Sequence, residues 1–209
     1  MCTRFHVESQ SFPGFIERAQ RTVLANDFMA KLGKNLSMSG EIRPTDVAAV
    51  LAPNKDGKMA VFPMLWGFTH ESAAAPVVNC RLETADQKDM WKDSWFRRRC
   101  VIPASWYYEW EHFASPDRSK KKTGAKYAIQ PKGASVTWIA GLYRFEDRGG
   151  LLVPVFSVIT RWACGELKAL HDRMPLILDK ESVVDWIKPD GNPGEVAGNA
   201  VTEMMFEKC

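Results

Sequence analysis

The sequence predicts an α+β fold in one domain over residues 1–209, built mainly on a curved or barrel-like antiparallel β-sheet with flanking helices. Three observations support this. Short β-rich segments bounded by turn signals recur along most of the chain, helical periodicity is confined to a few stretches, and no linker, repeat or change of composition divides the sequence. With 45% hydrophobic residues, a chain of 209 residues can bury one substantial core.

The first half of the chain is predicted to alternate helix and hairpin. Apolar residues at helical spacing predict a helix over 15–32, with Gly33 as its C-cap, and residues 40–46 are typical of a turn. Strands are expected at 47–52 and 59–68, and Asn54-Lys55-Asp56-Gly57 is a good hairpin turn between them. After an extended segment at 77–81, Thr84-Ala85-Asp86-Gln87 fits a capping box that opens a helix towards Trp91.

The second half is dominated by predicted strands. A buried strand is expected at 100–103, and residues 111–126, rich in Ser, Lys, Pro and Gly, are predicted to be a loop whose Lys120-Lys121-Lys122 run is solvated. Further elements are expected as strands at 127–130, 136–145 and 151–160, a helix at 164–170, an extended segment at 174–178 and a helix at 181–187 capped by Asp179.

Composition restricts the function classes. The five cysteines are odd in number and include no C-x-x-C pair, so we expect reduced thiols, an intracellular protein, and neither a metal site nor a cofactor. The opening is polar and no apolar run approaches the ~20 residues of a membrane span, so we expect a soluble, cytoplasmic protein. We also expect it to be a monomer. A net charge of +3 permits nucleic-acid binding through a local basic groove without requiring it.

Cys2 is the candidate nucleophile. Removal of Met1 would give Cys2 a free amine and a thiol on adjacent carbons, although a cysteine at position 2 can also be an accident of the start codon. An α-amino group has a pKa of about 7.7–8.0, so part of it is nucleophilic near neutral pH. The amine can form a Schiff base with an aldehyde, and the thiol can close onto the imine carbon to give a thiazolidine ring.

Four segments place polar residues within otherwise apolar sequence. They are Cys2-Thr3-Arg4, Asn79-Cys80-Arg81-Leu82-Glu83-Thr84, Trp106-Tyr107-Tyr108-Glu109-Trp110 and Leu170-His171-Asp172-Arg173-Met174-Pro175. Together with Trp66-Gly67, and in this order, these segments resemble the motifs of the SRAP family, the SOS response-associated peptidase-like proteins that sense abasic sites in single-stranded DNA and crosslink to them. The resemblance is clearest over residues 2–187.

The resemblance implies a role for each of these residues. Cys2 would supply the amine and thiol, Glu109 and His171 would move protons, and Asn79 would hold the opened sugar without adding charge. Arg4 and Arg81 would bind phosphates, with Arg173 in support, and Trp66 and Trp106 would stack on bases. For an internal arginine, pairing with an acid such as Glu83 is the competing interpretation.

The sequence departs from the family pattern at three places. Thr3 replaces the usual glycine beside the nucleophile, Glu41 stands where an asparagine is usual, and the loop after Trp66-Gly67 reads Thr69-His70-Glu71-Ser72. A DNA wedge from this loop is therefore in doubt.

Three functions fit these residues. The first is abasic-site processing in single-stranded DNA, in which a covalent thiazolidine on Cys2 shields the site. Alternatively, the Schiff base could lose a proton and the DNA strand would break, which is a lyase activity. The second is a cysteine-type autopeptidase that removes Met1. The third is a non-catalytic single-stranded DNA binder. Each of the DNA functions predicts binding that tolerates any base sequence and weakens as the salt concentration rises. We expect this binding to take place within the cell, at the nucleoid during repair.

Overall fold

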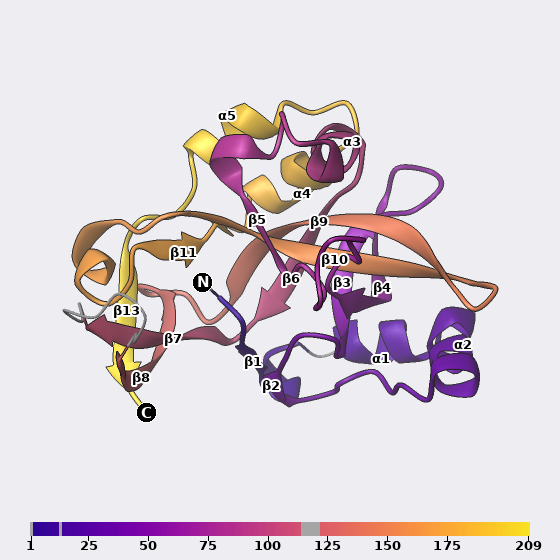
Figure 1. Cartoon of the computed structure of the whole chain (residues 1–209), viewed down its shortest axis with the longest axis horizontal. Coiled ribbons are helices and arrows are strands. Elements are labelled where there is room, and N and C mark those ends of the chain that lie inside the picture. Colours follow the sequence, from indigo (N-terminus) through magenta and orange to yellow (C-terminus); the bar gives the residue numbers. More distant parts are fainter. Residues whose placement is uncertain (1, 13, 114–121) are drawn as a thin grey trace.

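The computed structural model describes residues 2–12, 14–113 and 122–209 (Figure 1). Its strands are β1 (Phe5–Val7), β2 (Gly40–Ile42), β3 (Val47–Pro53), β4 (Met59–Trp66), β5 (Asn79–Arg81), β6 (Arg99–Ala104), β7 (Trp106–Phe113), β8 (Lys122–Pro131), β9 (Thr137–Arg148), β10 (Leu151–Trp162), β11 (Arg173–Pro175), β12 (Ile177–Leu178) and β13 (Met204–Lys208). Its α-helices are α1 (Phe15–Gln20), α2 (Val23–Leu32), α3 (Asp89–Arg97), α4 (Ser182–Ile187) and α5 (Pro193–Gly198). The α+β class and the predominance of strands confirm the prediction.

A closed barrel forms the centre of the fold. Strands β10, β4, β3, β6 and β9 pair in this order, and the long antiparallel pairing of β9 with β10 closes the ring. All of these pairs are antiparallel except β10 with β4. Strand β5 adds to β10 in parallel, which places a segment from the middle of the sequence beside the end of the barrel.

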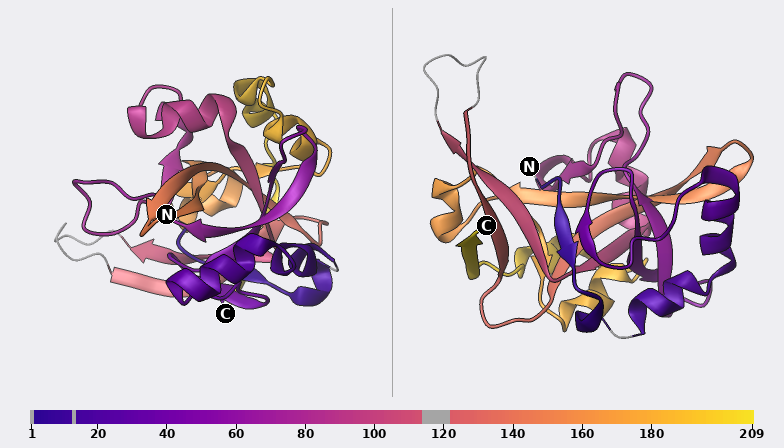
Figure 2. Two further views of the ribbon diagram at one scale, coloured as in Figure 1. Left: turned by 90° about the vertical axis from the view of Figure 1, so that its right-hand side faces the viewer. Right: turned by 90° about the horizontal axis from the view of Figure 1, so that it is seen from below.

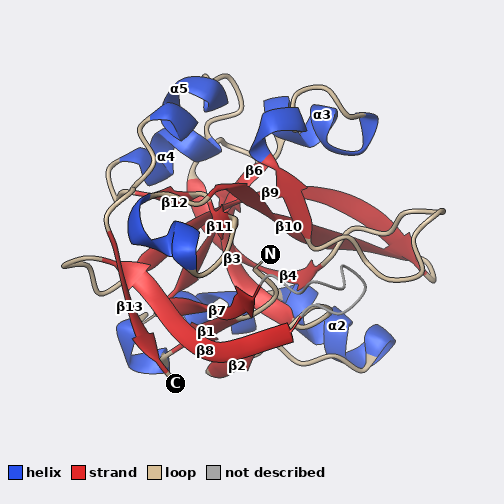
Figure 3. Ribbon diagram, turned by 60° about the vertical axis from the view of Figure 1, so that its left-hand side comes forward, coloured by secondary structure: helices blue, strands red, loops and turns tan. Residues whose placement is uncertain are grey.

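A second, five-stranded sheet lies beside the barrel in the order β13, β8, β7, β1, β2. Figure 3 shows β13, β8 and β7 side by side in a curved layer. A buried cluster joins the two sheets, with Phe5 and Tyr107 from the second sheet and Met64, Ile102 and Phe156 from the barrel strands. This packing fixes the N-terminal strand β1 against the barrel.

Helices cover the strands on two opposite sides (Figures 1 and 2). Helix α1 packs on β3 and β4, whereas α3 packs on β9 and β6, and α4 packs on β6. Trp95 of α3, Trp186 of α4 and Leu142 of β9 belong to a second buried cluster. The two clusters occupy alternate faces of the same strands, as the two-residue repeat of a strand requires.

Several predicted elements are confirmed with their end signals. Strands β3 and β4 form the predicted hairpin, in which Gly57 has φ 74° and the Asn54 carboxamide accepts two backbone N–H bonds. Gly33 ends α2 in the left-handed conformation, and Asp179 accepts from the backbone N–H of Ser182 at 2.7 Å. The other predicted strands and helical segments of the second half are present within a few residues, although residues 165–169 form a 3-10 helix.

Three local predictions were wrong. The helix expected over 15–32 is two helices, because Thr22 adopts an extended conformation and caps α2. Residues 40–42 form β2 instead of part of a turn, since they pair with β1. The predicted capping box at Thr84 does not open a helix, and α3 begins at Asp89 after Lys88.

The predicted loop 111–126 also differs from the structure. Residues 111–113 extend β7, and residues 122–126 belong to β8, which pairs with β7. Lys120 and Lys121 lie outside the described residues. All five cysteines are free thiols. Within the described ranges, none of the helices has the length and apolar character needed to cross a membrane.

Candidate active site

Cys2 lies just before β1 and is fully buried. Its Sγ lies 3.7 Å from the carbonyl oxygen of Arg4. Burial, and after it the negative charge of Glu109, raises the pKa of the Cys2 thiol to about 12. The thiol is therefore protonated near neutral pH, and its reaction as a nucleophile requires that a neighbouring group accept its proton.

Asn79 binds the main chain at this position. It lies on β5, opposite Val158 of β10, and its Nδ2 donates a 2.9 Å hydrogen bond to the carbonyl oxygen of Cys2. The amide oxygen Oδ1 of Asn79 is buried and has no hydrogen-bond partner among the described residues. Because a buried acceptor without a partner is costly, this oxygen is a strong candidate to bind a hydroxyl or an amine of a ligand.

Glu109 reaches the same place from β7. Strand β7 runs antiparallel to β1, with Tyr107 opposite Phe5 and the backbone N–H of Tyr108 donating to the carbonyl of Arg4 at 2.9 Å. This register brings Glu109 beside the segment that contains Cys2. Glu109 is 4% exposed, and burial raises the pKa of its carboxyl group above the ordinary value, so the acid form persists to higher pH.

His171 completes the cluster. Its Nε2 lies 4.0 Å from Oε1 of Glu109, and its imidazole is 7% exposed. On the other side of the ring, Nδ1 lies 2.9 Å from the backbone nitrogen of Arg173 and 2.8 Å from Oδ1 of Asp172. These contacts fix the ring orientation, so that the Nε2 atom is directed towards Glu109.

Tyr107 is a member of the site to which the sequence analysis gave no role. Its hydroxyl is buried, with no hydrogen-bond partner among the described residues, and burial, Cys2 and Glu109 together raise the pKa of this phenol well above its ordinary value. The sequence contained a signal for the position of Tyr107, because residues two apart on a strand share a face. A buried Glu109 therefore implied that Tyr107 faces the same site.

The side chain of Arg4 is held by an acidic residue, and its guanidinium lies 5.7 Å from the ring centroid of Trp110. Its Nη1 lies 2.5 Å from Oε1 of Glu41, and Nζ of Lys126 lies 2.6 Å from Oε2 of the same carboxylate. Hydrogen bonds from Lys126 and Arg4 lower the pKa of Glu41 to about 2, although burial opposes this shift. Glu41, which departs from the usual asparagine, thus neutralises part of the positive charge that Arg4 would offer to a phosphate.

The two remaining candidate arginines occupy different environments. Arg81 is exposed, and its guanidinium makes no hydrogen bond or ion pair within the described part of the chain. Arg173 is 5% exposed, and its guanidinium binds both carboxylate oxygens of Glu83 at 2.8 and 2.9 Å and the carbonyl of Thr160 at 2.7 Å. The expected supporting contact of Arg173 with phosphate therefore needs correction, because both terminal nitrogens of its guanidinium donate inside the protein and the side chain is buried.

The expected stacking of Trp66 on bases also needs correction. Trp66 is fully buried, its Nε1 donates to the carbonyl of Val78 at 3.0 Å, and its ring stacks on Phe156 with centroids 5.8 Å apart. The indole has no surface open to a base. It supports the wall between the barrel and the second sheet.

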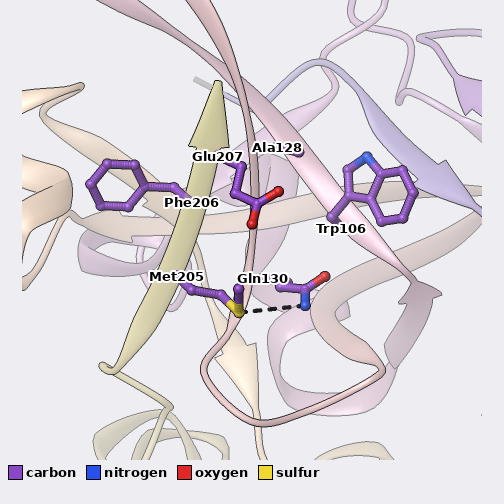
Figure 4. Close-up of a pocket in the computed structure, with 6 residues that line it drawn as sticks. All are labelled: Trp106, Ala128, Gln130, Met205, Phe206 and Glu207. Carbon is purple, nitrogen blue, oxygen red and sulfur yellow. Dashed lines mark hydrogen bonds between the residues drawn. The ribbon is translucent and has the colours of Figure 1, made fainter. Parts of the chain in front are cut away.

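Trp106 lies on the other face of β7 from Glu109. Successive residues of a strand point to opposite faces, so Tyr107 and Glu109 face the site while Trp106 faces away. Its ring stacks on His6 at 4.3 Å, and it lines a separate pocket of about 230 Å³ with Gln130 and Met205 (Figure 4). The structure thus groups Cys2, Asn79, Glu109 and His171, and leaves Trp106 outside this group.

Known proteins are similar to this chain in sequence. The sequence matches the family described as SOS response associated peptidase (SRAP) over residues 1–207. It is 31% identical over 161 residues to abasic site processing protein YMR114C of Saccharomyces cerevisiae, covering 73% of this chain and 40% of that protein. It is 31% identical over 120 residues to abasic site processing protein YobE of Bacillus subtilis, covering 57% of this chain and 52% of that protein. The matched regions thus span about half or less of these relatives.

Solved structures show the same fold. A protein from Bacteroides thetaiotaomicron superposes with a TM-score of 0.71 at 18% identity, covering 99% of this chain and 91% of that one. A phage-related protein from Bordetella bronchiseptica superposes with a TM-score of 0.69 at 21% identity, covering 100% of this chain and 94% of that one. The sequence match over nearly the whole length, in a chain with this fold, is decisive. The chain belongs to the SOS response associated peptidase family.

Proposed function

We propose that this protein processes abasic sites in single-stranded DNA by forming a thiazolidine crosslink through Cys2 after removal of Met1. One observation carries the proposal: Asn79, Glu109 and His171 come from three distant parts of the chain and converge on the buried residue Cys2. Relatives that carry the name abasic site processing protein support the substrate class.

The first step would join the Cys2 amine to the aldehyde of the ring-opened sugar. The nitrogen lone pair attacks the aldehyde carbon and, after a proton moves from nitrogen to oxygen, gives a carbinolamine. Loss of water then gives an iminium ion, the protonated Schiff base. Glu109 suits the role of the acid that protonates the departing hydroxyl, because burial raises the pKa of its carboxyl group and so favours the protonated form. His171, 4.0 Å from Glu109, can exchange protons with it and with the sugar oxygen during ring opening.

The second step would close the ring. The Cys2 thiol gives its proton to the Glu109 carboxylate left by the first step. The sulfur adds to the iminium carbon, and the C=N electron pair moves to the nitrogen, which keeps its own proton. The product is a thiazolidine, and the balance of both steps is aldehyde plus aminothiol to thiazolidine plus water. A thiol pKa of about 12 makes assistance by a base necessary, and Glu109 is the nearby carboxylate that burial makes a better base.

The DNA strand would be held by charge and by the sugar contacts. The exposed Arg81 and, once released from Glu41, Arg4 are suited to bind the phosphates beside the lesion. The unpartnered Oδ1 of Asn79 would accept a hydrogen bond from a sugar hydroxyl. We expect the protein to act as a monomer within the cell, at DNA that is being repaired.

A denaturing gel tests this proposal. Protein confirmed to lack Met1 is mixed with single-stranded DNA carrying one abasic site, and with the same DNA without the lesion. We expect a heat-stable shifted band that requires both the lesion and Cys2, and that is absent for Cys2→Ala. A band of equal intensity for Cys2→Ala would overturn the proposal.

The same cluster supports a second activity, removal of Met1. Attack of the Cys2 sulfur on the preceding carbonyl carbon would form a thioester and free the Cys2 amine, and water would then release the methionine. The position of Glu109 beside the Cys2 thiol favours this, because the thiol must lose its proton to react. Purified protein that retains Met1 should lose it on incubation without any aminopeptidase, and Glu109→Gln should retain it.

A further inference from the structure

We propose that Trp162 is a stacking site for a nucleobase of the DNA strand that enters the active site. This inference rests on the proposed function and adds a residue that the family motifs do not include. It is carried by the exposure of Trp162, by the rigid support of its ring, by its place in the strand register and by the pocket beside it.

The indole of Trp162 is exposed where the other tryptophans are not. Its relative exposure is 62%, and the other seven of the eight tryptophans, all in the described ranges, are buried or half-buried. A tryptophan ring offers 150–250 Å² for burial, so exposing one forgoes more packing energy than exposing any other side chain. Packing therefore does not explain the tryptophan at this position.

The ring of Trp162 is supported from one side by a fixed cation. Trp162 lies directly opposite Arg173 in the β10–β11 pair, and the Arg173 guanidinium lies 4.7 Å from the ring centroid. Arg173 is itself held by two hydrogen bonds to Glu83. A ring that is already ordered loses little conformational entropy when a base stacks on it.

The strand register connects Trp162 to the active site. On β10, Val158 lies opposite Asn79 and Thr160 lies opposite Arg81, and Trp162 follows two residues later on the same face. At about 3.3 Å per residue, Trp162 lies about 13 Å along the strand from the level of Asn79. A DNA strand with its lesion at Asn79 and a phosphate at Arg81 would therefore reach Trp162 within a few nucleotides.

The pocket beside Trp162 is suited to a base more than to a phosphate. It has a volume of about 510 Å³ and is lined by Trp162, Arg161, Asp86 and Gln87, with Glu83 at its wall. The carboxylate of Asp86 repels a phosphate, whereas the Gln87 amide offers both a donor and an acceptor to a base edge. The neighbouring Arg81 and Arg161 supply the positive charge for the backbone on either side.

Fluorescence of 2-aminopurine tests this proposal. Single-stranded DNA carries one abasic site and one 2-aminopurine, moved in turn through the positions on each side of the lesion. With the wild-type protein lacking Met1, we expect quenching at one position on one side, caused by stacking. Trp162→Ala should abolish this quenching and weaken the initial binding about 10-fold, while Trp162→Phe retains part of both.

The control is Leu152→Ala, which removes another apolar side chain of β10, 61% exposed, at the opposite end of the strand. It should leave quenching and binding unchanged. If Trp162→Ala crosslinks normally and gives the wild-type quenching at every position, the stacking site is refuted while the proposed function stands. If the wild type forms no crosslink, the proposed function fails, and the same 2-aminopurine scan on undamaged DNA still decides whether Trp162 stacks on a base.

Discussion

The side-chain amide of Asn79 donates a 2.9 Å hydrogen bond to the main-chain carbonyl of Cys2. This bond ties the start of the chain to β5 and thereby to the barrel strand β10. It orients the main chain at the nucleophile, because the carbonyl of Cys2 is bonded to the Cα that carries the amine, and the thiol is on the adjacent Cβ. The geometry of the reacting residue therefore depends on a contact made 77 residues away.

Replacing Asn79 should slow crosslinking more than it destabilises the protein. Asn79→Ala removes one partly buried hydrogen bond, which costs about 1 kcal/mol of unfolding free energy, and it also removes the amide oxygen proposed to bind the sugar. The rate is measured by single-turnover gel assay and the stability by denaturant unfolding. Asn54→Ala, which removes two hydrogen bonds in the distant hairpin, should lower stability comparably and leave the rate unchanged. Equal rates for both variants would contradict the role of Asn79.

Glu109→Gln should lower the crosslinking rate about 100-fold, which is the size of effect typical of removing a general acid. Burial raises the pKa of Glu109, so the wild-type rate should fall as rising pH ionises this carboxyl group. The glutamine variant should lack this decline. A pH–rate profile from acidic to mildly basic pH measures both effects, and a decline of the same size in Glu109→Gln would assign it to another group.

Glu41→Asn should strengthen the salt dependence of DNA binding. The substitution releases Arg4 and Lys126 from the carboxylate, and one additional phosphate contact should steepen the slope of log affinity against log salt by about 0.7. Fluorescence anisotropy over a salt series measures the slope. Glu146→Gln is the matched control, because it removes a carboxylate that binds Arg144 and Arg148 at the β9–β10 hairpin. If both variants steepen the slope equally, the effect is one of net charge alone.

Glu41 should also contribute to acid stability. Its pKa is lowered from an ordinary value of 4.5 to about 2 in the folded protein, so its contribution is complete above pH 4.5 and is lost as the pH falls towards 2. Glu41→Gln should therefore lose less stability than the wild type over this interval. Thermal unfolding at a series of pH values tests the difference, and parallel curves for the two proteins would contradict it.

Alanine substitutions of Arg81 and Arg173 should have different effects, one on DNA binding and the other on the stability of the fold. Arg173→Ala breaks the charged hydrogen bonds to Glu83 and should cost about 2 kcal/mol of unfolding free energy. Arg81→Ala removes an exposed side chain and should weaken binding to single-stranded DNA without changing the melting temperature. Loss of stability in Arg81→Ala, or an unchanged melting temperature in Arg173→Ala, would show that the assigned environments are incorrect.

Local signals predicted the parts of the fold that depend on local chemistry. The Asn54–Gly57 turn, the Gly33 C-cap and the Asp179 cap each follow from what one residue type can do with its neighbouring backbone. Residues 122–126 were missed because their Lys and Gly content is typical of a loop. They form a strand only because β7 provides its partner.

The site was predicted in composition and only partly in arrangement. Cys2, Asn79, Glu109 and His171 converge as the motifs implied, but their convergence depends on the pairing of β5 with β10 and of β7 with β1. The burial of Trp66 gave no sequence signal, because a tryptophan at the end of an apolar strand is equally typical of a core and of a stacking surface. On β7, aromatic residues on both faces concealed which face was internal.

Intact mass of the DNA adduct tests the central claim most directly. Protein lacking Met1 is reacted with single-stranded DNA containing one abasic site, heated without borohydride, and compared with Cys2→Ser and with protein that retains Met1. The thiazolidine mechanism predicts an adduct with the summed mass of protein and DNA minus one water for the wild type alone. Cys2→Ser should give an adduct only after borohydride reduction. A wild-type adduct that also requires borohydride would contradict ring closure by the thiol, and the absence of any wild-type adduct would contradict the crosslinking function itself.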